Sequence, residues 1–176
     1  LKRLMGNVKG KKVLDLACGE GRFARFFASV GAKVTGIDIS EGLIEAALEE
    51  ETKHPLGIEY LVSDVAHLDM IDSESFDVAY CYMALMDIRD YEGTISEAAR
   101  VLRKGGRFIV IIIHPCFNFQ RVLDGKTVSG WDEHIRENGT KEFLRYWLSD
   151  YFRRYSYTFE WKHDRLPSSF VTTGFH

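Results

Sequence analysis

The sequence predicts an α/β fold in which helices cover both faces of a doubly wound, mostly parallel sheet. Short runs rich in β-branched residues recur along the chain, and segments of helical periodicity separate them. The runs of strand length are 12–16, 33–37, 58–62, 76–81 and 107–113. The first and last are almost continuously apolar, as expected of strands buried on both faces, and we expect the last to be central in the sheet.

Three segments between these runs carry helix signals. The phenylalanines within 23–27 are spaced for one helix face, and Gly31 ends that helix. Ser40 is a suitable N-cap for a second helix that reaches about residue 51. The segment 91–102 reads as a third helix, which two following glycines break. Strands and helices therefore alternate, as a parallel sheet requires.

Composition limits the class of protein. From 176 residues with 45% hydrophobic content we expect one domain with an ample core. The net charge of -3 gives no global basic field, so we expect no nucleic-acid partner. No apolar run reaches membrane-spanning length, and three cysteines without C-x-x-C spacing fit a reducing compartment. We therefore expect a cytoplasmic protein without a membrane partner.

Acidic and small residues gather where the first two strands are expected to end. Asp15 lies inside the first strand, where an unpaired carboxylate costs several kcal/mol and so needs a partner or a cationic ligand. Ala17, Gly19 and Gly21 let the backbone turn sharply and a ligand approach closely. Asp38 ends the second strand and can accept hydrogen bonds from two ribose hydroxyls. Since parallel strands share one carboxyl edge, the pattern predicts a site for an adenosine-containing ligand.

The stretch DLACGEG, residues 15–21, resembles motif I of the class I S-adenosylmethionine-dependent methyltransferases. That motif reads E/D-x-G-x-G-x-G, and Ala17 stands here at its first glycine. The stretch ISEAARVLRKGGRFIVIIIHPCF resembles a helix, double-glycine turn and strand of the same family, so that the resemblance covers 13–116. It implies a Rossmann-like fold, S-adenosyl-L-methionine as cofactor and methyl transfer to a small, apolar or aromatic acceptor.

The resemblance also implies site residues beyond the first two strands. Asp64 would take the adenine amino group and the amide of Val65 a ring nitrogen, although Asp64 could instead cap the segment after it. The segment after the fourth strand would line the methionine part of the cofactor. No metal site is expected. The expected cofactor-binding residues are Asp15, Ala17, Cys18, Gly19, Gly21, Asp38, Ile39, Leu43, Asp64, Val65, Cys81 and Tyr82.

A hydroxyl or ammonium acceptor would need a general base. His114, at the end of the fifth strand, is the best-placed candidate, with a structural histidine before Pro115 as the preferred alternative. Asp87 and Tyr82 are lesser candidates.

Two other functions stay open. The stretch GEGRFA, residues 19–24, fits the dinucleotide fingerprint G-x-G-x-x-G/A, which indicates a nicotinamide-dependent oxidoreductase. That function predicts a pyrophosphate at the helix after Gly21 and an apolar residue where Asp15 stands. A noncatalytic S-adenosylmethionine-binding domain is the other alternative.

Residues 117–176 differ from the rest in being rich in aromatic side chains. We expect 1–116 to form the cofactor-binding core, and 117–176 to form a cap or substrate-pocket extension of the same domain, or else only a core of their own. Within this part we expect a helix at 142–155 and a strand at 155–161. The family's final antiparallel strand pair is either compressed into 155–175 or missing from a truncated form, and we favour the second.

Overall fold

The computed structural model describes residues 1–113, 121–123, 126–135, 141–148, 156–162 and 169–175, with side-chain contacts for 1–113. Its main element is a five-stranded sheet in the order β3-β2-β1-β4-β5, in which every pair is parallel. The strands are β1 (Lys12–Leu16), β2 (Lys33–Asp38), β3 (Glu59–Val62), β4 (Phe76–Tyr82) and β5 (Leu102–Ile111). The strand order reverses between β1 and β4, and ligands of open α/β sheets bind at such a point.

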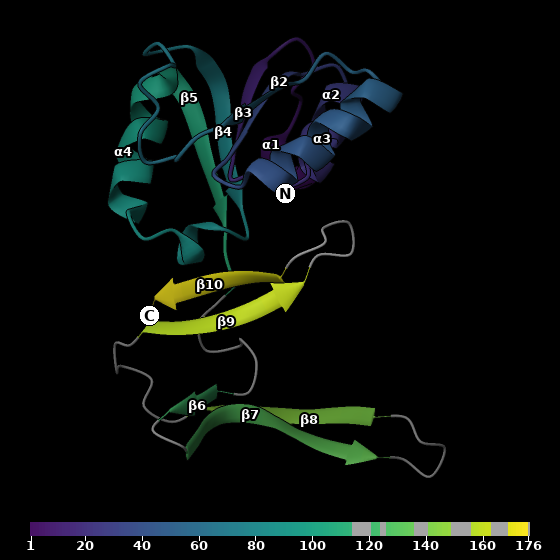
Figure 1. Cartoon of the computed structure of the whole chain (residues 1–176), viewed down its shortest axis with the longest axis vertical. Coiled ribbons are helices and arrows are strands. Elements are labelled where there is room, and N and C mark those ends of the chain that lie inside the picture. The colour runs from purple at the N-terminus through teal and green to yellow at the C-terminus, as the bar shows by residue number, and fades with distance from the viewer. Residues whose placement is uncertain (114–120, 124–125, 136–140, 149–155, 163–168, 176) are drawn as a thin grey trace. The chain divides into compact units, whose positions relative to one another are not determined.

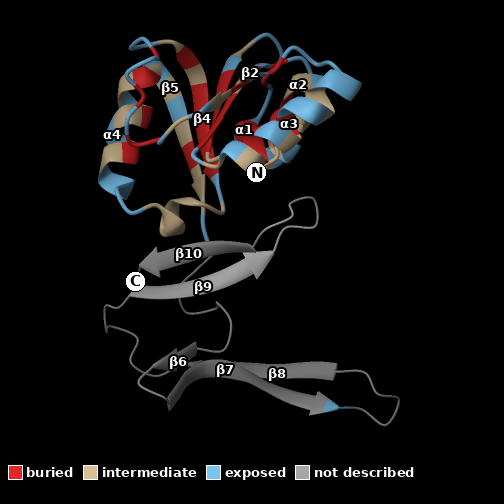
Figure 2. Cartoon of the chain, in the orientation of Figure 1, coloured by how far each residue is buried: buried red, intermediate tan, exposed pale blue. Residues whose placement is uncertain are grey.

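Helices cover both faces of this sheet, as predicted (Figure 1). They are α1 (Lys2–Met5), α2 (Arg22–Ser29), α3 (Glu41–Lys53) and α4 (Tyr91–Val101), with a 3₁₀ turn η1 (Leu85–Asp87) before α4. One buried cluster joins α1, α2 and α3 to the sheet, and a second joins α4 and the loop after β3 to the opposite face. Figure 2 shows the buried residues concentrated on the strands between these layers. None of the described helices has the length and apolarity needed to cross a membrane.

The helix boundaries follow the signals in the sequence. The Ser40 side chain accepts a hydrogen bond from the Leu43 amide at the start of α3, and Asp90 accepts one from the Gly93 amide at the start of α4. The double-glycine break after α4 is present as an irregularity in β5. Phe76 pairs with Leu102, whereas Val78 already pairs with Arg107, so β5 has three more residues than β4 between these two pairs.

The predicted central position of the fifth strand is wrong, because β5 lies at the edge of the described sheet and pairs there with β4. Its continuous apolar character has another cause. Ile109 packs into the cluster beneath α1 and α2, whereas Phe108 packs against the cluster beneath α4. An uninterrupted apolar run therefore indicates that both faces of a strand are covered by helices, and it does not indicate that the strand has a neighbour on each side.

Beyond residue 113 the described elements are strands. A three-stranded sheet contains β6 (Arg121–Leu123), β7 (Lys126–Ile135) and β8 (Lys141–Leu148), with antiparallel pairing. The predicted helix at 142–155 is thus wrong over the part that the structure describes. Aromatic residues favour strands, and the Asn138-Gly139 pair in the sequence is a hairpin signal that the helical interpretation overlooked.

A second small sheet pairs β9 (Ser156–Lys162) with β10 (Ser169–Phe175), so the strand predicted at 155–161 is confirmed. A strand pair is therefore present within 155–175, as in the less favoured expectation, and its equivalence to the family's final pair stays a prediction. The chain divides into two compact units, 1–112 with 158–174, and 113–157 with 175–176. The expected division into a core at 1–116 and a cap at 117–176 also stays a prediction.

Candidate functional site

The predicted acids lie at the carboxyl ends of three neighbouring strands. Asp15 is the penultimate residue of β1 and Asp38 is the last residue of β2, and both are buried. Asp64 is exposed and follows β3 after one intervening residue, Ser63, whose amide donates to the Asp38 carbonyl at 3.0 Å. Because β1, β2 and β3 are adjacent and parallel, the three acids share one edge of the sheet, as expected.

The carboxylate of Asp38 is fixed from two sides. Its Oδ2 accepts a hydrogen bond from the Gly19 amide at 2.8 Å, and its Oδ1 accepts one from the Ser40 amide at 2.9 Å. Burial raises the pKa of Asp38, while the amides around it counteract this rise. The contact with Gly19 ties the turn after β1 to the end of β2, so that both predicted binding segments form one structure.

Asp15 is held by a residue that the sequence analysis did not single out. The Tyr80 hydroxyl, from β4, donates to Asp15 Oδ2 at 2.5 Å, and both side chains are buried. Burial raises the pKa of Asp15 to about 7, the Tyr80 hydrogen bond opposes the rise, and the charge of Asp38 adds to it. Near neutral pH the Asp15 carboxyl therefore exchanges between its acid and its carboxylate, and a nearby cation would favour the carboxylate.

Gly19 and Gly21 of the turn are glycines for different structural reasons. Both have positive φ, 56° at Gly19 and 76° at Gly21. A β-carbon at Gly19 would meet no atom within 4 Å, so a ligand can approach the backbone there. A β-carbon at Gly21 would instead overlap the phenol of Tyr60 from β3. The absence of a side chain leaves room for a ligand at Gly19, whereas at Gly21 it leaves room for the Tyr60 ring. The predicted contact of Gly21 with the cofactor would thus be through backbone atoms.

Ala17 and Met83 have left-handed backbone conformations, with φ of 59° and 58°. They directly follow β1 and β4, the two strands between which the strand order reverses. Such conformations cost energy for residues other than glycine and concentrate at functional sites. The predicted role of Ala17 at the first glycine of the motif is compatible with this geometry.

The remaining predicted residues differ in how far their side chains are exposed. Val65 and Cys81 are buried in the cluster beneath α4, so only their backbone is available to a ligand, and burial raises the pKa of Cys81 to about 12. Leu43 is 9% exposed and Ile39 is 69% exposed.

Tyr82 is 36% exposed, and its ring centroid lies 4.4 Å from that of Phe23 on α2. This aromatic pair joins the first turn of α2 to the end of β4.

Cys18 is partly buried, and its amide donates to the Ile37 carbonyl at 2.9 Å, which continues the β1–β2 contact into the turn. Burial raises the pKa of its thiol, an effect that Asp15 and Asp38 strengthen.

The candidates for a general base are less well defined. Asp87 lies in η1, partly buried, and burial raises its pKa. His114 lies outside the described residues. Among the residues that the structure describes, no cluster of histidine, cysteine and acidic side chains is arranged to hold a metal ion.

Sequence reasoning missed Tyr80 and Tyr60 because each read as an ordinary strand residue. Both act on a partner far away in the sequence: Tyr80 on Asp15 across the β1–β4 pair, and Tyr60 on Gly21. The signal that could have found Tyr80 is the register, which sets it directly opposite Asp15.

With this geometry in place, comparison with known proteins decides the family. A profile of the family described as "Methyltransferase domain" matches residues 14–110, more than half of the chain. The chain belongs to this methyltransferase-domain family. The matched segment contains the turn after β1, both buried acids and the whole of α4.

Individual relatives agree with this assignment. The methyltransferase domain is 30% identical over 139 residues to a ubiquinone biosynthesis O-methyltransferase of Coxiella burnetii, a match covering 79% of this chain and 58% of the relative. The chain thus spans about 58% of the length of that curated relative.

Two solved structures resemble the domain. One is an S-adenosylmethionine-dependent methyltransferase from Mesorhizobium loti, with TM-score 0.66, 28% identity and coverage of 88% of this chain and 65% of that one. The other is a putative S-adenosylmethionine-dependent methyltransferase from Listeria monocytogenes, with TM-score 0.68, 27% identity and coverage of 99% and 73%. The parallel sheet with flanking helices is therefore the Rossmann-like fold of this family.

Proposed function

We propose that this methyltransferase domain binds S-adenosyl-L-methionine at the carboxyl edge of its sheet and transfers the methyl group to a small acceptor. The observation that carries the proposal is the geometry of Asp38. Each of its oxygens accepts one backbone amide, from Gly19 and from Ser40. A carboxylate has about four acceptor positions, so both oxygens retain capacity for the two hydroxyls of a ribose.

The charge of the site favours this cofactor over a dinucleotide. Asp15 and Asp38 are both buried at this edge and interact electrostatically. A diphosphate would add negative charge beside two acids, whereas an amino-acid ammonium and a sulfonium would compensate them. The nicotinamide-dependent alternative also called for an apolar residue where Asp15 stands, and the structure instead holds a hydrogen-bonded acid there.

Each residue is assigned one part of the cofactor according to its position at the sheet edge. Asp38 would hold the ribose, Asp15 the charged amino-acid end, and Asp64 with the Val65 amide the adenine. The backbone at Gly19 lies open to a close approach, and Tyr82 with Phe23 forms an aromatic surface at the end of β4. The cofactor supplies an activated methyl group. The protein contributes alignment, which is worth roughly 7–11 kcal/mol for well-oriented reactants.

The nature of the acceptor is part of the proposal. The name of the Coxiella relative, an O-methyltransferase of ubiquinone biosynthesis, supports a small acceptor that carries a hydroxyl. An aromatic surface suits an apolar or aromatic acceptor. A hydroxyl acceptor would use a general base, for which His114 remains the first candidate and Asp87 and Tyr82 are the lesser ones. The aromatic-rich part, 117–176, is proposed as the acceptor pocket.

Calorimetric titration of the full chain tests the proposal. We expect S-adenosylmethionine and S-adenosylhomocysteine to bind, and NAD not to bind. Asp38→Ala removes the ribose acceptors and should weaken S-adenosylhomocysteine by at least about tenfold, because hydrogen bonds to a charged group contribute roughly 1.5–3 kcal/mol. Tight NAD binding, or an affinity unchanged in Asp38→Ala, would overturn the assignment. Binding without turnover of any hydroxylated aromatic acceptor would favour the noncatalytic alternative.

A further inference from the structure

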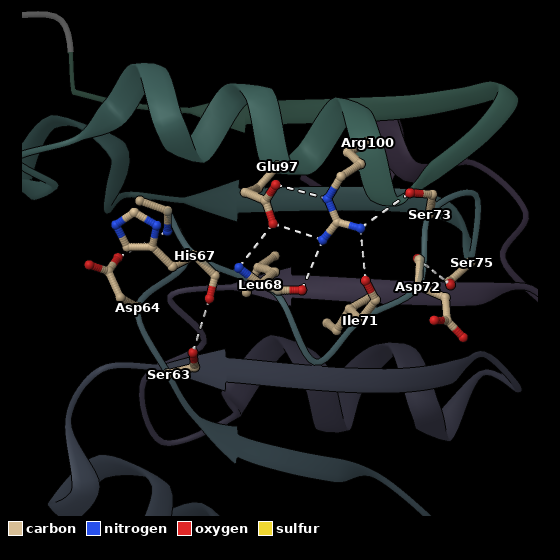
Figure 3. Close-up of polar contacts among 11 residues, drawn as sticks. Ser63, Asp64, His67, Leu68, Ile71, Asp72, Ser73, Ser75, Glu97 and Arg100 are labelled. Atoms are coloured by element: carbon tan, nitrogen blue, oxygen red, sulfur yellow. Dashed lines mark hydrogen bonds and ion pairs between the residues drawn. The ribbon is translucent and has the colours of Figure 1, made fainter.

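The loop that joins β3 to β4, residues 63–75, has no helix or strand of its own and yet starts at the cofactor edge. Its first residue donates its amide to the Asp38 carbonyl, so the loop begins beside the proposed ribose site. A loop without ladder hydrogen bonds needs other partners for its buried backbone groups. Figure 3 shows where these partners come from.

Glu97 and Arg100 of α4 form a pair that faces this loop (Figure 3). The guanidinium donates to both carboxylate oxygens of Glu97, at 2.8 Å each. It also donates to the carbonyls of Leu68 and Ile71, at 2.8 Å each, and to the Ser73 hydroxyl at 3.3 Å. The planar guanidinium thus joins two loop carbonyls to one carboxylate, a geometry that a lysine ammonium cannot reproduce.

Leu68 is held at both of its backbone groups. Its amide donates to Glu97 Oε2 at 2.9 Å, and its carbonyl accepts from Arg100. Its side chain is fully buried in the cluster beneath α4, together with Val65 and Ile71. The Glu97–Arg100 pair therefore provides Leu68 with the donor and the acceptor that a neighbouring strand would otherwise provide.

The four residues before Leu68 form a closed turn that includes Asp64. Asp64 Oδ1 accepts from the Ala66 amide at 2.9 Å, and the His67 amide donates to the Asp64 carbonyl at 3.0 Å. The Ser63 hydroxyl donates to the His67 carbonyl at 3.4 Å. Since the turn is held together internally, its position is set by the burial of Val65 in the cluster beneath α4 and by what anchors its two ends. These anchors are the Asp38 carbonyl at Ser63 and the Glu97–Arg100 pair at Leu68.

We propose that Glu97 and Arg100 are positioning residues for adenine recognition, because they fix the turn that carries Asp64 and Val65 against α4. The inference rests on the proposed function. It attributes the selectivity for the adenine amino group to the contacts that Glu97 and Arg100 of α4 make with the loop backbone. Exposed ion pairs contribute little to stability. The side chain of Arg100 is 33% exposed and that of Glu97 is 19% exposed, and three of their hydrogen bonds go to loop backbone, at Leu68 and Ile71.

The test compares two ligands that differ at the edge of the purine that carries C6 and N1. S-adenosylhomocysteine carries the 6-amino group from which Asp64 would accept a hydrogen bond. S-inosylhomocysteine carries a carbonyl oxygen there and a proton on the adjacent N1. Calorimetry on the full chain measures both affinities in wild type, Arg100→Met and Arg100→Lys. The control is Arg103→Met, which breaks the 2.9 Å ion pair with Asp77 at the opposite end of β4 from Tyr82.

We expect Arg100→Met to lower the affinity for S-adenosylhomocysteine about tenfold, the effect of losing one hydrogen bond to a charged group, and to leave S-inosylhomocysteine nearly unchanged. Arg100→Lys should fall between wild type and Arg100→Met, and Arg103→Met should match wild type. Amide hydrogen exchange of residues 64–68 should accelerate in Arg100→Met and not in Arg103→Met. If Arg100→Met does not fold, the ratio of affinities in Arg100→Lys decides.

An equal loss of both affinities in Arg100→Met, or an unchanged ratio between them, would overturn the inference while leaving the proposed function intact. The absence of S-adenosylhomocysteine binding in wild type would instead refute the proposed function itself. The two failures are therefore distinguishable within one experiment.

Discussion

Replacing Asp15 by asparagine should make the protein more stable at neutral and alkaline pH. Burial raises the pKa of this carboxyl from 3.8 to about 7, although Tyr80 donates a hydrogen bond to it. The native state therefore binds the proton more tightly than the unfolded state does. Between about pH 4 and pH 7 the unfolding free energy must fall as pH rises, because folding then requires a buried negative charge.

The difference in pKa sets the magnitude. A rise from 3.8 to about 7 corresponds to about 4 kcal/mol at 1.36 kcal/mol per unit, an upper bound for one group. Asparagine carries no charge at any pH, and its carbonyl can still accept from Tyr80. The stability of Asp15→Asn relative to wild type should therefore be pH-independent below pH 4, rise through the interval, and level off above pH 8. The contribution of Asp38, whose pKa burial also raises, largely cancels in this difference.

Urea unfolding of both proteins at one-unit steps from pH 3 to pH 9 measures the curve, and Glu45→Gln, at an exposed position on α3, is the control for replacing an acid by its amide. A relative stability of Asp15→Asn that does not change with pH would refute the reasoning, because it would mean that Asp15 ionises as freely in the native state as in the unfolded chain. The same variant should bind S-adenosylhomocysteine more weakly, since it lacks the charge that compensates the ammonium.

Two further predictions concern the turn and the start of β3. Gly21→Ala should destabilise by about 2–4 kcal/mol, combining a left-handed alanine with overpacking against Tyr60. Gly19→Ala has the same sign of φ but open space, and should cost only about 1 kcal/mol in thermal unfolding; equal costs would contradict the steric role of Tyr60. Glu51→Ala should cost about 2 kcal/mol, because Glu51 Oε1 accepts from the amides of Leu56, Gly57 and Ile58. Glu49→Ala, at an exposed position, is the matched control in urea unfolding. A similar loss of unfolding free energy in that variant would contradict the role of the Glu51 hydrogen bonds.

Local patterns were sufficient to predict most of the core. The strands of the five-stranded sheet were recognisable because their apolar runs are short, and β2 in addition ends at an acid that is followed by a helix cap, Asp38 and Ser40. The carboxyl-edge position of Asp15 and Asp38 followed from parallel pairing alone. These features depend on residues that are close in sequence.

The features that the sequence did not reveal depend on distant partners. The edge position of β5 could not be read from an apolar run, because the run records that Ile109 and Phe108 are both covered, not which strand lies beside them. The Asp15–Tyr80 hydrogen bond requires knowing that β1 and β4 are neighbours in register. Glu97 and Arg100 have the spacing of an ordinary pair on one helix face, and their contacts with the loop backbone involve residues far away in the sequence.

The distance between the Asp38 carboxylate and the ribose of a bound cofactor product is the most direct test of the central claim. A crystal structure of the full chain with S-adenosylhomocysteine should place both ribose hydroxyls within about 2.6–3.2 Å of the two Asp38 oxygens. A complex in which Asp38 contacts no ribose hydroxyl, with the nucleoside bound elsewhere on the sheet, would contradict the account.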